Sequence, residues 1–207
     1  MEPLFGVPPA PDEVRRRAAK RVPPGQYLTE KFPVLSYGET PYIKKEEWTF
    51  AVGGAVEREV RLDHAGLLKL PRTYVTRDFH CVTGWSRLDI AWEGVKVRDV
   101  LALAAPRPEA THVMAVCYGN YTTNLALDTV LEEDVLLAFR HDGKDLEPEH
   151  GGPVRLVVPS RYGYKSAKWL RALDLLVGDQ PGFWENLGYH SNADPWKEER
   201  YGPPFRP

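Results

Sequence analysis

Short runs in which apolar and polar residues alternate, or in which β-branched residues follow one another, occur along most of the chain. Both patterns are typical of strands. The predicted strands are two within residues 48–60 around a Gly53-Gly54 turn, and one each at residues 73–81, 88–92, 112–118, 122–127, 135–139 and 154–158. The strand at 73–81 would deliver Cys81 into the loop that follows it.

Few stretches have the spacing of a helix. Asp63 is placed to cap a short helix that runs through Leu70, and residues 12–20 and 97–104 predict two others. Residues 165–177 place apolar side chains on related faces, which fits either a helix or a turn followed by a strand. Many short strands, few long helices and no regular strand–helix–strand alternation predict an α+β fold built on a mixed sheet.

The chain of 207 residues is long enough to bury a sizeable core. Residues 1–33 are rich in proline and charge and predict an irregular N-terminal arm. We expect residues 34–207 to form a single domain. Its tail from Gly182 is full of aromatic, proline and charged residues and predicts ordered coil.

Composition narrows the function classes. Hydrophobic residues make up 43% and charged residues 27%, and a net charge of −2 gives no electrostatic reason to expect nucleic acid or a membrane surface as partner. No apolar stretch approaches the roughly 20 residues that cross a bilayer. Basic residues near the N-terminus are followed by further charge and not by the hydrophobic stretch of a signal peptide. We therefore expect no membrane span and a cytoplasmic protein.

Cys81 is the first candidate for chemistry. It lies in a polar, aromatic and glycine-bearing segment, residues 78–86, and the chain has only one other cysteine, Cys117. Two cysteines at this spacing fit neither a disulfide framework nor a zinc cluster. The segment indicates either a nucleophile or a single thiolate ligand to a metal-bearing cofactor. The alternative is a half-buried cysteine that acts as a small hydrophobe.

A second cluster of chemistry lies at residues 150–169, around a short apolar strand. Arg155, Lys165 and Lys168 could surround a phosphate, with Ser166 and backbone amides as further donors. The segment contains neither a Walker loop nor a dinucleotide-binding glycine motif. The alternative is a solvated basic turn.

Taken together, these segments resemble a known family. FHCVTGWS, an AWEGV segment, EHGGPVRLVVPSRYGYKSAKWL and GFWENLGYHSNADPW follow one another between Phe32 and Trp196. In this order they resemble the sulfite oxidase superfamily, and more narrowly the bacterial sulfite-oxidase-like molybdopterin-dependent oxidoreductases, which include the catalytic subunit of periplasmic methionine sulfoxide reductase. The resemblance implies a sulfite-oxidase-type molybdopterin-binding fold.

The resemblance also implies a cofactor, a mononuclear molybdenum–molybdopterin, and the residues that hold it. Cys81 matches the cysteine whose thiolate binds molybdenum and would be the catalytic residue. The matching cofactor-binding positions are Ser36, Tyr37, Cys81, Cys117, His150, Arg155, Ser166, Ala167 and Lys168. For Cys117 the alternative is a buried strand cysteine, and for His80, beside the ligand, strand alternation favours packing over a role at the metal.

The implied reaction is a two-electron oxygen-atom transfer on a small substrate, either sulfite-like or an S-oxide or N-oxide. The arginine that sulfite oxidases carry soon after the ligand cysteine is not reproduced here, although Arg77 or Arg161 could compensate. A separate electron-transfer protein is expected as partner. The alternatives are a non-catalytic molybdopterin carrier and a metal-free module that binds a phosphorylated ligand.

Overall fold

The structure is a computed structural model that describes residues 20–202, and its order of elements follows the predicted run of short strands. The strands are β1 (Tyr27–Leu28), β2 (Thr49–Gly54), β3 (Val60–Asp63), β4 (Arg72–His80), β5 (Trp85–Lys96), β6 (His112–Cys117), β7 (Thr122–Ala126), β8 (Leu136–His141), β9 (Lys144–Asp145), β10 (Arg155–Val157) and β11 (Leu170–Leu176). The α-helices are α2 (His64–Leu67), α3 (Val97–Ala104), α4 (Leu127–Val130) and α5 (Phe183–Asn186), and the 3₁₀ turns are η1 (Pro148–His150), η2 (Gly163–Lys165) and η3 (Pro195–Lys197).

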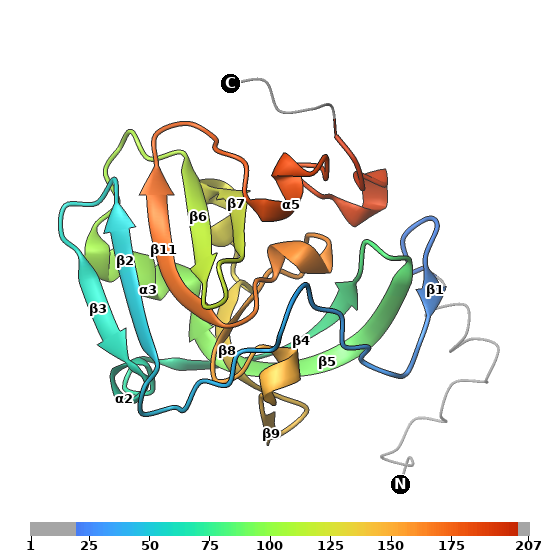
Figure 1. Ribbon diagram of the computed structural model, residues 1–207, viewed down its shortest axis with the longest axis horizontal. Coiled ribbons are helices and arrows are strands. Elements are labelled where there is room, and N and C mark those ends of the chain that lie inside the picture. The colour runs from blue at the N-terminus through green and yellow to red at the C-terminus, as the bar shows by residue number, and fades with distance from the viewer. Residues whose placement is uncertain (1–19, 203–207) are drawn as a thin grey trace, which may run out of the picture.

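The strands form two mixed sheets. One has the order β3-β2-β11-β6-β7, in which β11 runs parallel to β2 and antiparallel to β6. The other is built on the long strand β5, which pairs with β1, β4 and β8, while β8 continues to β9 and β10. In Figure 1 the first sheet stands on the left and β4 and β5 sweep away from it toward the right.

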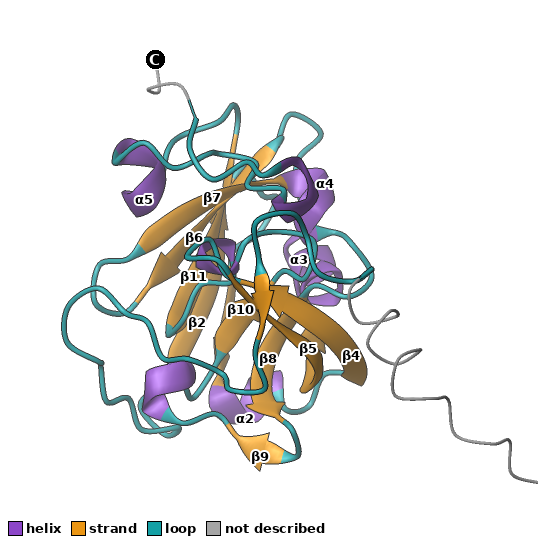
Figure 2. Cartoon of the chain, turned by 90° about the vertical axis from the view of Figure 1, so that its right-hand side faces the viewer, coloured by secondary structure: helices purple, strands orange, loops and turns teal. Residues whose placement is uncertain are grey.

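The main core lies between the first sheet, helix α3 and the second sheet, which contributes Leu137, Phe139 and Leu156. Helix α3 contributes Val97, Val100, Leu101 and Ala104, all fully buried, and Figure 2 shows it below α4, to the right of the first sheet. Complete burial of one such aliphatic side chain is worth roughly 1.5–3 kcal/mol. A second, smaller cluster around Phe79, Trp85 and Trp92 lies on the other sheet. This second cluster supports the candidate site.

The α+β fold and most predicted strands are confirmed, and the differences have local causes. Residues 165–177 divide into the turn η2 and the strand β11, so the second of the two interpretations is correct. Strand β5 spans 12 residues because β4 and β8 both pair along it, although charged residues interrupt its apolar pattern. Asp63 caps α2 by accepting a bond from Gly66 N at 2.6 Å, but the helix ends at Leu67.

The two ends of the chain also depart from expectation. The part of the predicted N-terminal arm that the structure describes contributes β1 to a sheet. The predicted helix at residues 12–20 falls, except for its last residue, outside the described residues. The tail after Gly182 is not coil throughout, because it contains α5 and η3. Within residues 20–202, no helix combines the length and apolar character needed to span a membrane.

Candidate cofactor site

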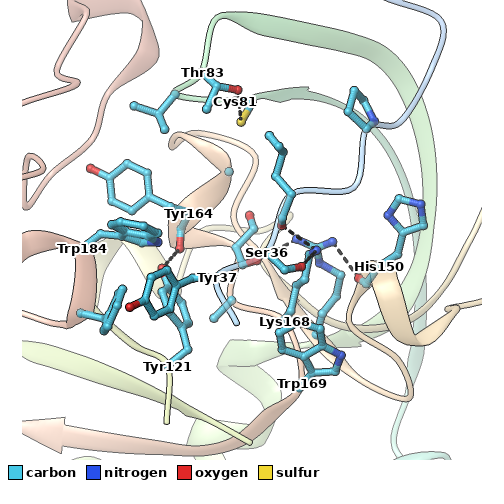
Figure 3. Close-up of a pocket in the computed structure, with 18 of the residues that line it drawn as sticks. Ser36, Tyr37, Cys81, Thr83, Tyr121, His150, Tyr164, Lys168, Trp169 and Trp184 are labelled. Carbon is cyan, nitrogen blue, oxygen red and sulfur yellow. Dashed lines mark hydrogen bonds between the residues drawn. The ribbon is translucent and has the colours of Figure 1, made fainter. Parts of the chain in front are cut away.

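A cavity of about 560 Å³ opens where loops from both sheets meet, a volume in the range of small-molecule and cofactor sites. Its wall comes from residues 32–37, the loop after β4, the β6–β7 turn, the η1 and β10 region, residues 163–169 and α5. In the view of Figure 3, Cys81 and Thr83 lie at the top, aromatic side chains lie on one side, and Lys168, Trp169 and His150 lie on the other. The cavity thus has an aromatic half and a basic half.

Cys81 is held by a tight turn at the end of β4. Its backbone N–H donates to the carbonyl of Trp85 at 2.8 Å, and its carbonyl accepts from Gly84 N at 3.0 Å. The thiol lines the cavity, with Sγ 3.1 Å from the Thr83 hydroxyl. Burial raises the pKa of the thiol, while the Thr83 hydrogen bonds and the charges of Arg200 and Lys168 oppose that rise.

Arg155 anchors the basic half from strand β10. Its guanidinium donates to the carbonyls of His150 at 2.9 Å and Ser166 at 2.7 Å, and it lies 5.5 Å from the ring centroids of Phe79 and Trp92. The side chain is buried, and this burial lowers its pKa to about 10. Arg155 therefore joins two cavity loops and keeps a positive charge between them.

Lys168 brings the second positive charge. Its ammonium donates to Ser36 Oγ and Leu35 O, both at 2.9 Å, and to Glu149 O at 2.6 Å. Burial and the neighbouring charge of Arg155 lower the pKa of Lys168 to about 7. Gly151 makes this packing possible, because a Cβ on it would meet the Lys168 Cβ at 2.9 Å.

His150 closes the basic half. Its ring stacks on Phe32 with centroids 4.4 Å apart and planes 10° apart. Burial, followed by the charge of Arg155, lowers its pKa to about 4. His150 is therefore a neutral imidazole at physiological pH, able to donate or accept one hydrogen bond at each nitrogen.

The aromatic half carries hydroxyl and indole groups but no charged side chain. Tyr121 donates to the carbonyl of Tyr164 at 2.6 Å, and Tyr37 packs against Phe183 and Trp184 with centroids 4.9 and 5.8 Å away. The rings come from four segments, so they are distant in sequence. They are Tyr37, Tyr121, Tyr164, Phe183, Trp184 and Tyr189.

The structure brings together all but one of the positions that the family resemblance nominated. Ser36, Tyr37, Cys81, His150, Arg155, Ser166, Ala167 and Lys168 line the cavity. Cys117 does not line it. It is buried in the main core, where burial raises its pKa far above the usual range, and this placement matches the alternative of a structural strand cysteine.

The structure also places Lys165 and His80, two further residues near these positions in the sequence. Lys165, grouped with Arg155 and Lys168 on sequence grounds, is excluded from the cavity wall: its ammonium is fully buried and donates to Glu185 Oε1 at 2.5 Å and Asn124 O at 2.6 Å. That grouping was wrong for Lys165. His80 packs away from the cavity and shares a 2.8 Å hydrogen bond with Ser86 Oγ, as strand alternation predicted.

Sequence reasoning missed several residues that shape the site. Phe32, Phe79, Thr83, Tyr121 and Tyr164 all line the cavity. Phe79 and Thr83 each lie two positions from Cys81, and Tyr164 lies in the basic segment, so these three carried a positional signal. Phe32 and Tyr121 are single aromatic residues in separate segments, and no local pattern relates them to the site.

The wall fits an anionic, sulfur-bearing cofactor. Within residues 20–202 no carboxylate lies within ion-pair distance of Arg155 or Lys168, whose partners are neutral oxygens, so two positive charges at the cavity lack a counter-charge. The buried Trp85 Nε1 has no hydrogen-bond partner in that part of the chain and lies on the wall. Cys81 adds a free thiol, the kind of donor that soft transition metals prefer.

Comparisons with known proteins agree with this donor set. Residues 37–184 match the family described as the oxidoreductase molybdopterin binding domain. The uncharacterized oxidoreductase YuiH of Bacillus subtilis is 44% identical over 182 residues, which cover 87% of this chain and 92% of that protein. The protein-methionine-sulfoxide reductase catalytic subunit MsrP of Gluconobacter oxydans is 33% identical over 72% of this chain and 54% of its own.

The fold has a solved counterpart in the sulfane dehydrogenase SoxCD of Paracoccus pantotrophus. The TM-score is 0.63 at 21% identity, over 84% of this chain and 54% of that one. The chain thus spans about half the length of that structure and of the Gluconobacter relative, but nearly all of the Bacillus one. This chain belongs to the sulfite-oxidase-like family of molybdopterin-binding oxidoreductases, and its cofactor is molybdenum–molybdopterin.

Proposed function

We propose that this oxidoreductase reduces a small, neutral S-oxide or N-oxide, with Cys81 as the protein ligand to molybdenum. Reduction of an S-oxide to a thioether consumes two electrons and two protons and releases water. When bound, the molybdenum–pterin group supplies the two-electron oxygen-atom transfer. The protein's own residues hold the cofactor, position the substrate and exclude water.

The basic half is suited to the pterin and its phosphate. Lys168 and Arg155 supply the positive charge, and Ser36 supplies a hydroxyl held by Lys168. Arg155 makes its bonds to loop carbonyls, so it acts mainly by holding the loops of His150 and Ser166 in place. His150, a neutral ring stacked on Phe32, is placed to exchange a hydrogen bond with the pterin.

The observation that carries the choice of substrate is the uncharged, aromatic character of the other half of the cavity. Sulfite is an anion and needs cationic partners. Arg77 is paired with Asp134 at 2.6 Å and Arg161 donates to Thr129 Oγ1 at 2.9 Å, and neither lines the cavity. Aromatic rings favour contact with the sulfur and methyl groups of a thioether or its S-oxide. Methionine sulfoxide reduction, the activity for which the Gluconobacter relative is named, lies in this class.

Metal analysis tests the ligand assignment. Wild type, C81S and C117S would be purified in parallel from a host that makes molybdopterin, and molybdenum counted by mass spectrometry. We expect about one molybdenum per chain in wild type and C117S, and loss of molybdenum or an altered electron paramagnetic resonance spectrum in C81S. Unchanged metal content and spectrum in C81S would remove Cys81 from the metal.

Substrate screening tests the choice of reaction. The loaded wild type would be supplied with reduced viologen and, in separate assays, methionine sulfoxide, an amine N-oxide and dimethyl sulfoxide. Sulfite would be tested in the oxidative direction with ferricyanide. Turnover of sulfite with none of the oxides would overturn the proposal.

Electrons must reach the site from another molecule, and we propose a separate electron-transfer protein as donor. Membership of an oxidoreductase family favours an enzyme over the two non-catalytic alternatives. These are a molybdopterin carrier and a module that binds a phosphorylated ligand. The cytoplasmic location stays a prediction, which rests on the two free cysteines, because unpaired thiols suit a reducing compartment.

A further inference from the structure

Three side chains with metal-binding atoms meet beside the cofactor cavity. They are His141 at the end of β8, Glu147 just before the turn η1, and His150 at its end. One donor atom from each lies within 4.8 Å of those of the other two. Among residues 20–202, no other three histidine, cysteine or acidic side chains bring their donor atoms this close together.

The donor set is that of a divalent transition metal. Two imidazoles and one carboxylate form the common three-ligand zinc set, with a further position left for water or another ligand. His141 Nε2 already lies 3.1 Å from Glu147 Oε2, close to the roughly 3.3 Å that separates two ligands bound at 2.0–2.1 Å in a tetrahedral site. The Glu147 side chain is half exposed, so it is free to adjust and leaves a path for an ion to enter.

The two histidines are held in place, and His141 has the outer contact that metal-binding histidines usually make. His141 Nδ1 faces Asp142 Oδ2 at 3.4 Å, the carboxylate–histidine arrangement that fixes the imidazole with Nε2 directed at the metal. The η1 turn is fixed by bonds from His150 N and Gly152 N to Glu147 O, both 3.0 Å. Phe32 stacks on His150 and contacts His141 edge-on at 5.7 Å. These contacts restrict the motion of both imidazoles and of the Glu147 backbone before an ion arrives.

We propose that His141, Glu147 and His150 bind one zinc-type divalent ion beside the cofactor cavity, distinct from the molybdenum site at Cys81. An imidazole has two nitrogens on different edges, so one nitrogen of His150 can bind the ion while the other serves the cavity. The ion then sets the tautomer and orientation of His150 where it meets the cofactor. The role of the ion is therefore to fix the position of His150 in the cavity wall.

Zinc titration of the full chain tests the proposal. Cofactor-free protein without a polyhistidine tag would be titrated with ZnCl₂ by calorimetry in a non-coordinating buffer. We expect one ion per wild-type chain, at least tenfold weaker binding in E147Q and H141A, and about tenfold weaker binding in D142N, the usual range for an outer contact. E147Q replaces a half-exposed side chain, so it is the variant expected to keep the fold if H141A loses it.

Two matched controls locate the ion. E149Q removes a neighbouring carboxylate whose side chain is outside the cluster, and H112Q removes a histidine on another sheet; both should bind zinc as wild type does. Bound Co²⁺ should give a visible ligand-field spectrum that E147Q changes and E149Q does not. Absence of stoichiometric zinc binding, or equal losses in E149Q and E147Q, would overturn the proposal. Molybdenum is counted separately, so this outcome is independent of the proposed function.

Discussion

At the residue scale, the property that matters most is positive charge without a counter-charge. Arg155 and Lys168 lie at the cavity with only neutral oxygens as partners, which is costly in an empty site and favourable when an anion is bound. Their pKa values, about 10 and about 7, express that cost. Anion binding should therefore depend on pH through Lys168.

Sulfate, which stays doubly charged above pH 3, is a suitable probe of this dependence in the cofactor-free protein. Below pH 7 the Lys168 ammonium is charged and attracts the anion; above it the amine becomes neutral and the attraction is lost. A unit charge at about 4 Å is worth roughly 1 kcal/mol in water-like surroundings, so affinity should fall about fivefold between pH 6 and pH 8.5. Arg155 and His150 titrate outside this window.

The matched variant for this measurement is K168R, whose guanidinium stays charged across the range. Its sulfate affinity, followed by calorimetry, should be nearly independent of pH. A wild-type profile as flat as that of K168R would show that Lys168 does not carry the pH dependence.

Arg155 also contributes to the stability of the fold. R155A removes two charge-assisted hydrogen bonds, to the part-buried carbonyl of His150 and the buried carbonyl of Ser166, and leaves both acceptors without this donor. Bonds of this type are worth roughly 1.5–3 kcal/mol each, partly offset by relief of the buried charge, so we expect the free energy of unfolding to fall by about 2–4 kcal/mol. Urea denaturation of the cofactor-free protein measures this. A midpoint equal to that of wild type would mean that the loops hold without Arg155.

The basic pattern of residues 150–169 grouped Lys165 with Arg155 and Lys168, and only the family resemblance favoured Lys168 over Lys165. The two lysines are three positions apart in a basic, glycine-containing segment, and only the path of η2 decides which ammonium faces the cavity. Lys165 turns inward because Glu185, 20 residues later, lies beneath it. A contact of that kind leaves no mark on the local sequence.

At the scale of elements, α5 is attached to the body of the protein through this buried pair. Lys165 and Glu185 side chains are 0% and 1% exposed, and Thr123 Oγ1 donates to the same Glu185 oxygen at 2.7 Å. The helix has only four residues and presents Phe183 and Trp184 to the cavity. Its position therefore depends on the pair more than on its own hydrogen bonds.

Removing one partner of the pair should be strongly destabilising. E185Q leaves the Lys165 charge buried beside a neutral amide, and breaking a buried ion pair in this way costs roughly 3–5 kcal/mol. Denaturant unfolding measures the loss, and hydrogen exchange should show faster exchange at the amides of residues 183–188. The double variant K165M/E185Q removes the charge as well and should recover part of the stability.

A surface variant serves as the control for that experiment. E133Q alters an exposed ion-pair cluster with Lys96 and Arg98, and exposed pairs contribute little, so its unfolding midpoint should match wild type. If E185Q were as stable as E133Q, the pair would not anchor α5.

Elements were easier to predict than their extent. The hydrophobic pattern located most strands because they either bury one face or, like β8 and β10, are continuous apolar runs buried on both faces. It missed the full length of β5, where Gly94 approaches β8 so closely that a Cβ would overlap the Leu137 carbonyl. It also missed α5, a single turn whose stability comes from a partner distant in sequence. A hydrophobic pattern reports the burial of a single segment. The length of β5 and the position of α5 depend instead on contacts between two segments.

At the scale of the whole molecule, both ends of the described chain close over the Cys81 loop. From the N-terminal side, Gln26 Nε2 donates to Cys81 O at 3.1 Å and Tyr27 N donates to Gly84 O at 2.9 Å. From the C-terminal side, Arg200 donates to the carbonyls of Val82 and, at 3.2 Å, Gly25. Arg200 thus ties the two ends and the cysteine loop together, with its guanidinium over Tyr162.

This arrangement predicts that the order of the Cys81 loop is set by residues more than 50 positions away on either side. R200A should speed amide exchange at residues 82–86 by about tenfold. This corresponds to a loss of roughly 1.4 kcal/mol, which is reasonable for two hydrogen bonds from a charged group at a partly exposed site. Q26A should have a smaller effect of the same sign, because it removes one neutral bond. R58A is the matched control, since Arg58 also donates to a surface carbonyl, that of Leu103, far from the cysteine.

Exchange is the right measurement because alkylation of Cys81 would mix two opposing effects. Loss of Arg200 exposes the thiol but also removes a positive charge that lowers its pKa, so reactivity could change in either direction. Amide exchange at residues 82–86 reports only the opening of the loop. If R200A and R58A exchanged alike there, the turn bonds within the loop, Cys81 N to Trp85 O and Gly84 N to Cys81 O, would suffice to hold the Cys81 sulfur in place. A selective effect of R200A would instead show that both ends of the described chain fix the backbone that carries the Cys81 thiol, the proposed molybdenum ligand.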